Sequence, residues 1–123
     1  MSSESSQGIV AQRIRNRRIE WLEIAAADDG DPWPSGLGSL VNHWFDWNPD
    51  APALADYPPP IYTPGEAEAL VAMGHAVNAL CDATPSPLVD DAAARAMPEW
   101  AHAMAAARHA LTEMSTRGRL PED

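Results

Sequence analysis

The sequence predicts a small all-α bundle of four to five helices, with a proline-rich strap (residues 48–63) between the second and third helices. Apolar residues recur three or four positions apart in successive segments, which is the spacing of one helix face. No segment shows the sustained alternation of apolar and polar residues that is typical of a strand. A chain of 123 residues suits one core, so we expect a single domain over residues 1–123, with loose tails at 1–4 and 118–123.

The first predicted helix covers residues 5–27 and ends at Asp28-Asp29-Gly30. We expect its apolar side to contain Val10, Ile14, Trp21 and Ala25, with Ile24 beside them. Its first half carries a cluster of arginines that gives residues 1–18 a net charge of +3. The four are Arg13, Arg15, Arg17 and Arg18. We expect them to pair with the acidic remainder of the chain, or with a second copy in a homodimer.

The second predicted helix lies within Trp33–Asp50, a stretch that holds three of the five tryptophans. Its apolar face has the i, i+3, i+4, i+7 spacing and consists of Leu37, Leu40, Val41 and Trp44. Pro34-Ser35 caps this helix and Asn48-Pro49 stops it. We expect Trp44 in the core, whereas Trp33 and Trp47 suit either the core or a partner interface.

The strap contains too many prolines for a regular helix or strand, because proline lacks an amide hydrogen and fixes φ. We expect an extended connection across the surface, with Tyr57, Ile61 and Tyr62 as its contacts. Thr63-Pro64-Gly65-Glu66 then has the pattern of a capping box and begins a third helix that runs to Ala83. Its predicted buried stripe is Leu70, Met73, Val77 and Leu80.

The C-terminal third predicts one interrupted helix or two. A helix begins near Leu88, and Pro98 either kinks it or starts a fresh helix. A regular stripe then predicts a core helix that ends at Gly118. Its members are Met97, Trp100, Met104, Ala107, Leu111 and Met114.

The charge distribution is the most unusual feature of the chain. Residues 19–94 carry thirteen Asp or Glu and no Lys or Arg, and the whole chain has a net charge of −10. Such a surface repels nucleic acid and steers positively charged partners toward the protein. Its alternative role is solubility alone.

The composition favours a cytoplasmic bacterial protein. No apolar run is long enough for a membrane span, and the N-terminus does not resemble a secretory signal. Cys81 is the single cysteine, which suits a reducing compartment, and we expect it to be buried. All basic residues are arginine and 23 residues are alanine, as in proteins of GC-rich bacteria.

Motifs of catalysis, cofactor binding and metal binding are weak. There is no Gly-x-Ser-x-Gly and no phosphate-binding loop. Glu99 and His102 have the spacing of a metal-binding pair, but they point away from the apolar stripe of their helix. We therefore expect no enzyme activity, metal or cofactor. The alternative is a small helical enzyme or ligand-binding protein that uses His43, Asp46 and His75 in a pocket beside Trp44.

The function that these observations favour is protein binding. We expect an acidic protein that neutralises or regulates a basic protein partner, by the same physical logic as immunity proteins and antitoxins. Its predicted partner-binding residues combine aromatic anchors with carboxylates. They are Trp33, Asp46, Trp47, Asp50, Asp56 and Tyr57.

Overall fold

Five α-helices and one 3-10 helix make up the parts of the chain that this computed structural model describes, residues 3–27, 37–84 and 91–120, and these parts contain no strand. In chain order the elements are α1 (Ser3–Ala26), α2 (Leu37–Trp47), η1 (the 3-10 helix Leu54–Asp56), α3 (Pro64–Ala83), α4 (Asp91–Arg95) and α5 (Pro98–Ser115). The predicted all-α bundle and the irregular strap between the second and third helices are confirmed. Among the described helices, none is both long enough and apolar enough to cross a bilayer.

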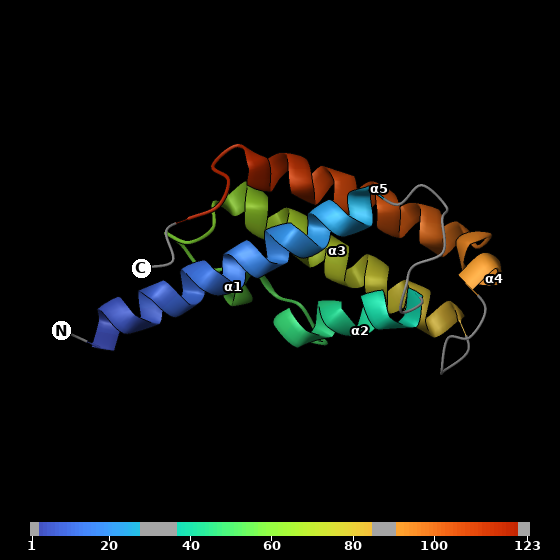
Figure 1. Cartoon of the computed structure of the whole chain (residues 1–123), viewed down its shortest axis with the longest axis horizontal. Coiled ribbons are helices and arrows are strands. Elements are labelled where there is room, and N and C mark those ends of the chain that lie inside the picture. Colours follow the sequence, from blue (N-terminus) through green and yellow to red (C-terminus); the bar gives the residue numbers. More distant parts are fainter. Residues whose placement is uncertain (1–2, 28–36, 85–90, 121–123) are drawn as a thin grey trace.

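Helices α3 and α5 form the centre of the bundle. They run side by side in opposite directions and make the most extensive contact between two elements (Figure 1). Helix α1 packs against α5 and also against α2, while the short α4 contacts α5. The first turns of α1 extend beyond the end of the bundle (Figure 1). Helix α2 is therefore held mainly through α1 and the core beneath it.

The start of α3 follows the predicted capping box. The Thr63 N–H donates to Oε1 of Glu66 over 2.8 Å, and the Glu66 N–H donates to Oγ1 of Thr63 over 3.2 Å. Pro64 occupies the first helical position, where its missing N–H has no helical partner to lose. The predicted stripe is buried along the whole helix, at Leu70, Met73, Val77 and Leu80. Cys81 is exposed, contrary to expectation, and lies in the last turn of α3.

Pro98 begins a fresh helix, which settles the alternative that the sequence left open. Trp100, Met104, Ala107 and Met114 are buried as predicted, whereas Met97 and Leu111 are half-buried. Beyond α5, Gly118 adopts φ of 69°, a left-handed conformation that glycine tolerates without strain. Its N–H donates to the carbonyl of Met114 over 2.8 Å and closes the end of the helix.

The predicted apolar side of α1 is wrong in part. Val10 and Ile24 are exposed, while Ile19 and Leu22 are buried instead. Trp21 and Ala25 are buried as expected. Three polar side chains in the middle of the helix are also buried, Arg15, Asn16 and Arg18. The inward face of α1 is thus partly polar, and apolar periodicity locates such a face poorly.

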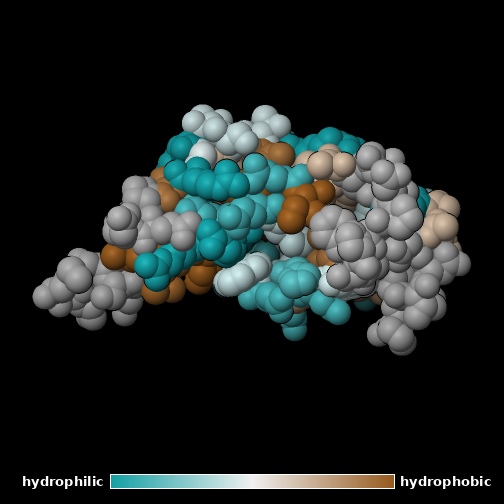
Figure 2. Space-filling view, viewed as in Figure 1, coloured by the Kyte–Doolittle hydropathy of each residue, from teal (hydrophilic) through white to brown (hydrophobic). Residues whose placement is uncertain are grey.

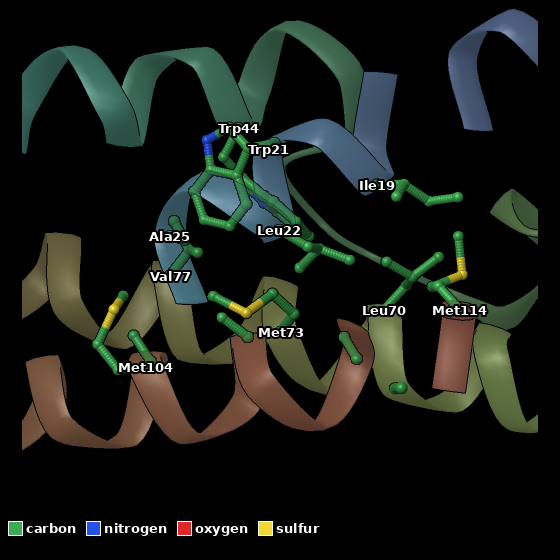
Figure 3. Close-up of a cluster of buried hydrophobic side chains, with 14 of the residues drawn as sticks. Ile19, Trp21, Leu22, Ala25, Trp44, Leu70, Met73, Val77, Met104 and Met114 are labelled. Atoms are coloured by element: carbon green, nitrogen blue, oxygen red, sulfur yellow. The ribbon is translucent and has the colours of Figure 1, made fainter. Parts of the chain in front are cut away.

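The two tryptophans of the core join α1 to α2. The rings of Trp21 and Trp44 lie 4.9 Å apart between their centroids, tilted by 60° (Figure 3). The Trp21 indole N–H donates to the carbonyl of Leu40 over 2.9 Å. Trp44 is completely buried, as predicted, yet its indole N–H finds no acceptor within the described residues. The contact combines ring packing with one satisfied hydrogen bond.

A buried ion pair ties α1 to α3. The guanidinium of Arg15 donates to both carboxylate oxygens of Glu66 over 2.9 Å each, and the two side chains are 0% and 1% exposed. Arg15 also donates to the carbonyl of Ile61 over 3.0 Å and to that of Gly118 over 3.0 Å. Burial alone would raise the pKa of the Glu66 carboxyl, but the hydrogen bonds from Arg15 and Thr63 hold it below its ordinary value.

The chain beyond α5 is also tied to α1, so the expectation of a loose tail is wrong for residues 118–120. The Asn16 amide donates to the carbonyl of Leu120 over 2.8 Å and accepts the Leu120 N–H over 2.9 Å. Arg119 pairs with Glu23. At the other end, residues 3 and 4 are helical, while residues 1–2 and 121–123 lie outside the described residues.

We predict that Glu66→Gln lowers the free energy of unfolding by about 3 kcal/mol, because it leaves the buried Arg15 without a counter-charge. Urea unfolding near neutral pH measures this loss. Glu68→Gln is the matched control on the exposed side of the same helix and should change stability by less than about 0.5 kcal/mol. Equal effects of the two variants would contradict a structural role for the ion pair.

The same carboxylate predicts an acid-sensitive part of the stability. The pKa of Glu66 is lowered in the folded state, so its stabilising effect is present above its ordinary value of 4.5 and is lost as the pH falls below that value. When the pH falls from neutral to below 4.5, the wild-type chain should therefore lose more stability than the Glu66→Gln variant does. Urea unfolding curves of both proteins at neutral pH and below pH 4.5 provide the comparison.

A second pair of variants tests the core tryptophans. Trp21→Phe removes a hydrogen bond as well as volume, whereas Trp44→Phe removes volume and an N–H that has no described partner. We expect Trp21→Phe to destabilise the chain by about 1 kcal/mol more than Trp44→Phe does. Thermal unfolding of both variants would reveal the difference, and the reverse order would refute it.

Candidate protein-binding surface

Two of the four N-terminal arginines, Arg15 and Arg18, are buried within their own chain. Arg18 donates to the carbonyl of Trp47 over 2.9 Å and to the Tyr62 hydroxyl over 2.6 Å. Arg15 is buried against Glu66, as described above. The homodimer contact expected through Arg13, Arg15, Arg17 and Arg18 is therefore wrong for Arg15 and Arg18, because no second chain can reach them. Of the expected alternatives, pairing with a carboxylate of the same chain holds for Arg15, whereas Arg18 donates to a carbonyl and a hydroxyl.

Tyr57 is also buried, so the expectation that it anchors a partner is wrong. Its hydroxyl donates to Oδ1 of Asn48 over 2.9 Å, and its ring meets that of Tyr62 edge-on, 5.4 Å between centroids. The Arg18 guanidinium lies 4.8 Å from the Tyr57 ring centroid on the interior side. The strap turns this side chain inward because the buried polar groups there satisfy its hydroxyl. Burial raises the pKa of Tyr57 to about 12.

The other predicted anchors lie at the surface or outside the described residues. Asp46, Asp50 and Asp56 are exposed, and Trp47 is 38% exposed. The backbone of this region is held in place, since the Asp50 carbonyl accepts from the Asn78 amide over 2.8 Å. Trp33 belongs to residues 28–36, which lie outside the described part of the chain.

An open groove runs between α1 and α2, beside Asp46. It has a volume of about 240 Å³, and Ile24 and Trp47, 43% and 38% exposed, form its apolar surface. Its lining residues are Arg17, Glu20, Trp21, Ile24, Leu40, His43 and Trp47. Arg17 and Glu20 form an ion pair of 2.7 Å. In Figure 2 the exposed surface over the middle of α1 and over α2 is largely hydrophilic, and hydrophobic atoms appear near the C-terminal end of α1.

The alternative catalytic pocket does not form as expected. His43 Nδ1 and an Asp46 carboxylate oxygen lie 3.3 Å apart, but both side chains are 62% exposed. His75 is exposed on α3 and does not line the groove, and neither does the buried Trp44. The carboxylate can orient the imidazole, yet open solvent surrounds the pair and leaves it without the dry surroundings that strengthen acid–base chemistry. Among the described residues, no group of three or more His, Cys, Asp or Glu could hold a metal ion.

A second, smaller groove lies over the strap. It has a volume of about 190 Å³, and it contains Leu54, which is 56% exposed. The remaining lining residues are Tyr57, Pro59, Tyr62, Thr63, Pro64, Ala67 and Glu68. It is mainly apolar and has one carboxylate at its edge.

Sequence reasoning missed the contribution of α1 to this surface. The apolar periodicity places Ile24 beside the apolar side of α1 and gives no signal for Glu20. Arg17, Glu20 and Ile24 recur at i, i+3 and i+7, which places them on one face of α1. That spacing was a usable signal, but it could not show that α2 lies alongside.

No protein-family model matches this chain, and no curated protein or solved structure matches it either.

We predict that the folded chain shows less phenolate absorbance at pH 10 than two ordinary tyrosines, each of which is half ionised at that pH. Burial raises the pKa of both tyrosines, and that of Tyr57 to about 12. Because these folded-state values are raised, the stability that they contribute is present below pH 10 and is lost as the pH rises toward about 12. Ultraviolet titration combined with circular dichroism tests both statements. Half-ionisation at pH 10 in a folded chain would place Tyr57 at the surface.

Proposed function

We propose that this chain is a small, acidic, non-enzymatic binding protein of the cytoplasm that neutralises or regulates a basic protein partner. One observation carries the proposal. A partly exposed Trp47 and an exposed Asp46 are adjacent at the end of α2, beside an apolar groove. Tryptophan is enriched among residues that dominate binding energy, and carboxylates at the edge of an interface steer cationic partners.

The internal use of arginine supports an acidic surface. The charge of Arg15 is neutralised by Glu66 in the interior, and Arg18 is bonded to the carbonyl of Trp47 and the hydroxyl of Tyr62. Arg17 pairs with Glu20 at the rim of the groove. With these cations engaged within the chain, a net charge of −10 acts mainly through exposed carboxylates. The partner class that such a surface favours is a basic protein rather than nucleic acid.

The second candidate function, a small enzyme or ligand-binding protein that uses His43 and Asp46, has weaker support. The groove beside His43 has a volume of about 240 Å³, whereas small-molecule sites usually occupy roughly 300 to 1,000 Å³. The groove therefore suits one large side chain of a protein better than a whole ligand. Titration of His43 by nuclear magnetic resonance in the presence of small-molecule libraries would detect a ligand site if one exists.

We predict that the double variant Asp46→Arg/Asp50→Arg associates with the basic partner roughly tenfold more slowly than the wild type, because it reverses two charges at the proposed interface. The immobilised chain captures the partner, mass spectrometry identifies it, and surface plasmon resonance with the purified pair measures the association rate. Raising the salt from 0.1 to 1 M shortens the screening length from about 10 to about 3 Å and should slow association steeply.

Glu68→Arg is the control. It reverses one exposed carboxylate on α3, which lines the smaller groove over the strap and not the groove between α1 and α2. Its association rate should stay within about twofold of the wild type. An acidic partner, or an association rate that neither salt nor the double variant changes, would overturn the proposed function.

A further inference from the structure

Large apolar side chains are exposed mainly along α1 and α2. Within the described residues there are four of them, and three lie on these two helices. The four are Val10, Ile24, Trp47 and Leu54. Ile24 and Trp47 face the same groove, where the buried Trp21 and Leu40 also contribute to the lining. The groove thus offers an apolar strip between two helices. A third helix that packs against a helix pair requires such a strip.

Charged groups occur on both helices that border this strip. On α1, Glu20 is 43% exposed and pairs with Arg17. On α2, Asp46 is 62% exposed and pairs with His43. Glu23 follows Glu20 along α1 and is exposed, paired with Arg119. Carboxylates on both helices favour a ligand that carries cations on either side of an apolar face.

The shape of the groove favours a helix over other occupants. Two helices side by side leave a channel into which the side-chain ridge of a third helix can fit. A second copy of this chain is a poor occupant, since it has the same net charge of −10 and since Arg15 and Arg18 of its α1 are buried. A segment with lysine or arginine beside apolar residues avoids this repulsion.

We propose that the groove between α1 and α2 binds a cationic amphipathic helix of the partner, with one large apolar side chain seated between Ile24 and Trp47. This inference rests on the proposed function and deepens it by naming the kind of element that docks. The rim carboxylates attract the helix, and the apolar strip supplies affinity that charge alone does not provide.

A defined peptide serves as the probe. One peptide of leucine and lysine has its leucines at helical spacing, a second has the same composition in scrambled order, and a third is oligolysine of the same length. Isothermal titration calorimetry measures their affinities for the full chain, and amide chemical shifts locate the contact. We expect the amphipathic peptide to bind roughly tenfold more tightly than the other two and to shift the amides of α1 and α2.

Variants separate the groove from general attraction. Ile24→Gln and Trp47→Gln each remove one wall of the groove and should weaken the amphipathic peptide roughly tenfold while leaving oligolysine binding unchanged. Leu54→Gln is the control, since Leu54 is also an exposed apolar side chain but lines the other groove. Circular dichroism confirms that each variant is folded. Two independent groove variants keep the test valid if one of them disturbs the helix.

The outcomes distinguish this inference from the proposed function. Equal affinities for all three peptides, weakened by Asp46→Arg/Asp50→Arg and not by Ile24→Gln, would overturn the helix site and leave the acidic binding protein intact. If Leu54→Gln alone weakened binding of the amphipathic peptide, the contact would lie at the strap and the proposed helix site would be overturned. Binding of none of the peptides would count against both. Sedimentation that shows a dimer abolished by Ile24→Gln would make a second copy the occupant and overturn the proposed helix.

Discussion

The buried pair of Arg15 and Glu66 is the interaction on which the rest of the structure depends. Two opposite charges removed from water must satisfy each other, and the remaining donors of the guanidinium must find further acceptors. The carbonyls of Ile61 and Gly118 supply those acceptors. One side chain thus holds α1, the start of α3, the strap and the turn after α5 in a single arrangement. Displacing α1 or α3 would leave a buried charge without its partner, and displacing the strap or the turn after α5 would leave guanidinium donors without acceptors.

This constraint also shapes the outer surface. Because Arg15 and Arg18 satisfy groups in the interior, they are withdrawn from a surface that is already rich in carboxylates. The inward polar face of α1 leaves Ile24 on the outer side of the helix, where α2 lies alongside and forms the groove. The burial of Arg15 and the exposure of Ile24 follow from the same orientation of α1, since the two residues lie about 180° apart around the helix.

Trp47 connects the interior to the proposed binding surface. Its carbonyl accepts a hydrogen bond from the buried Arg18, while its indole lies in the groove. The contact between Trp21 and Trp44 fixes the other side of α2. A surface anchor whose backbone is held in this way loses little conformational freedom on binding, which favours affinity. The same residues that stabilise α2 therefore preorganise the groove.

The sequence by itself determined the helices and most of the apolar core. The capping box of Thr63 and Glu66 and the stripes of α3 and α5 are local signals, because each depends on neighbours within a few residues. It also identified Trp44 as core and Asp46 as surface. For the candidate site, the sequence indicated Trp47 and the carboxylates, but neither the contribution of Ile24 nor the burial of Tyr57.

Only the tertiary structure decided which polar groups are buried. Arg15 meets Glu66 across 51 positions of the chain, and Asn16 meets Leu120 across 104. No periodic pattern predicts such contacts, since they depend on how helices far apart in the sequence come together. Apolar burial follows from spacing along one helix, whereas the burial of a charge requires a specific partner from another element.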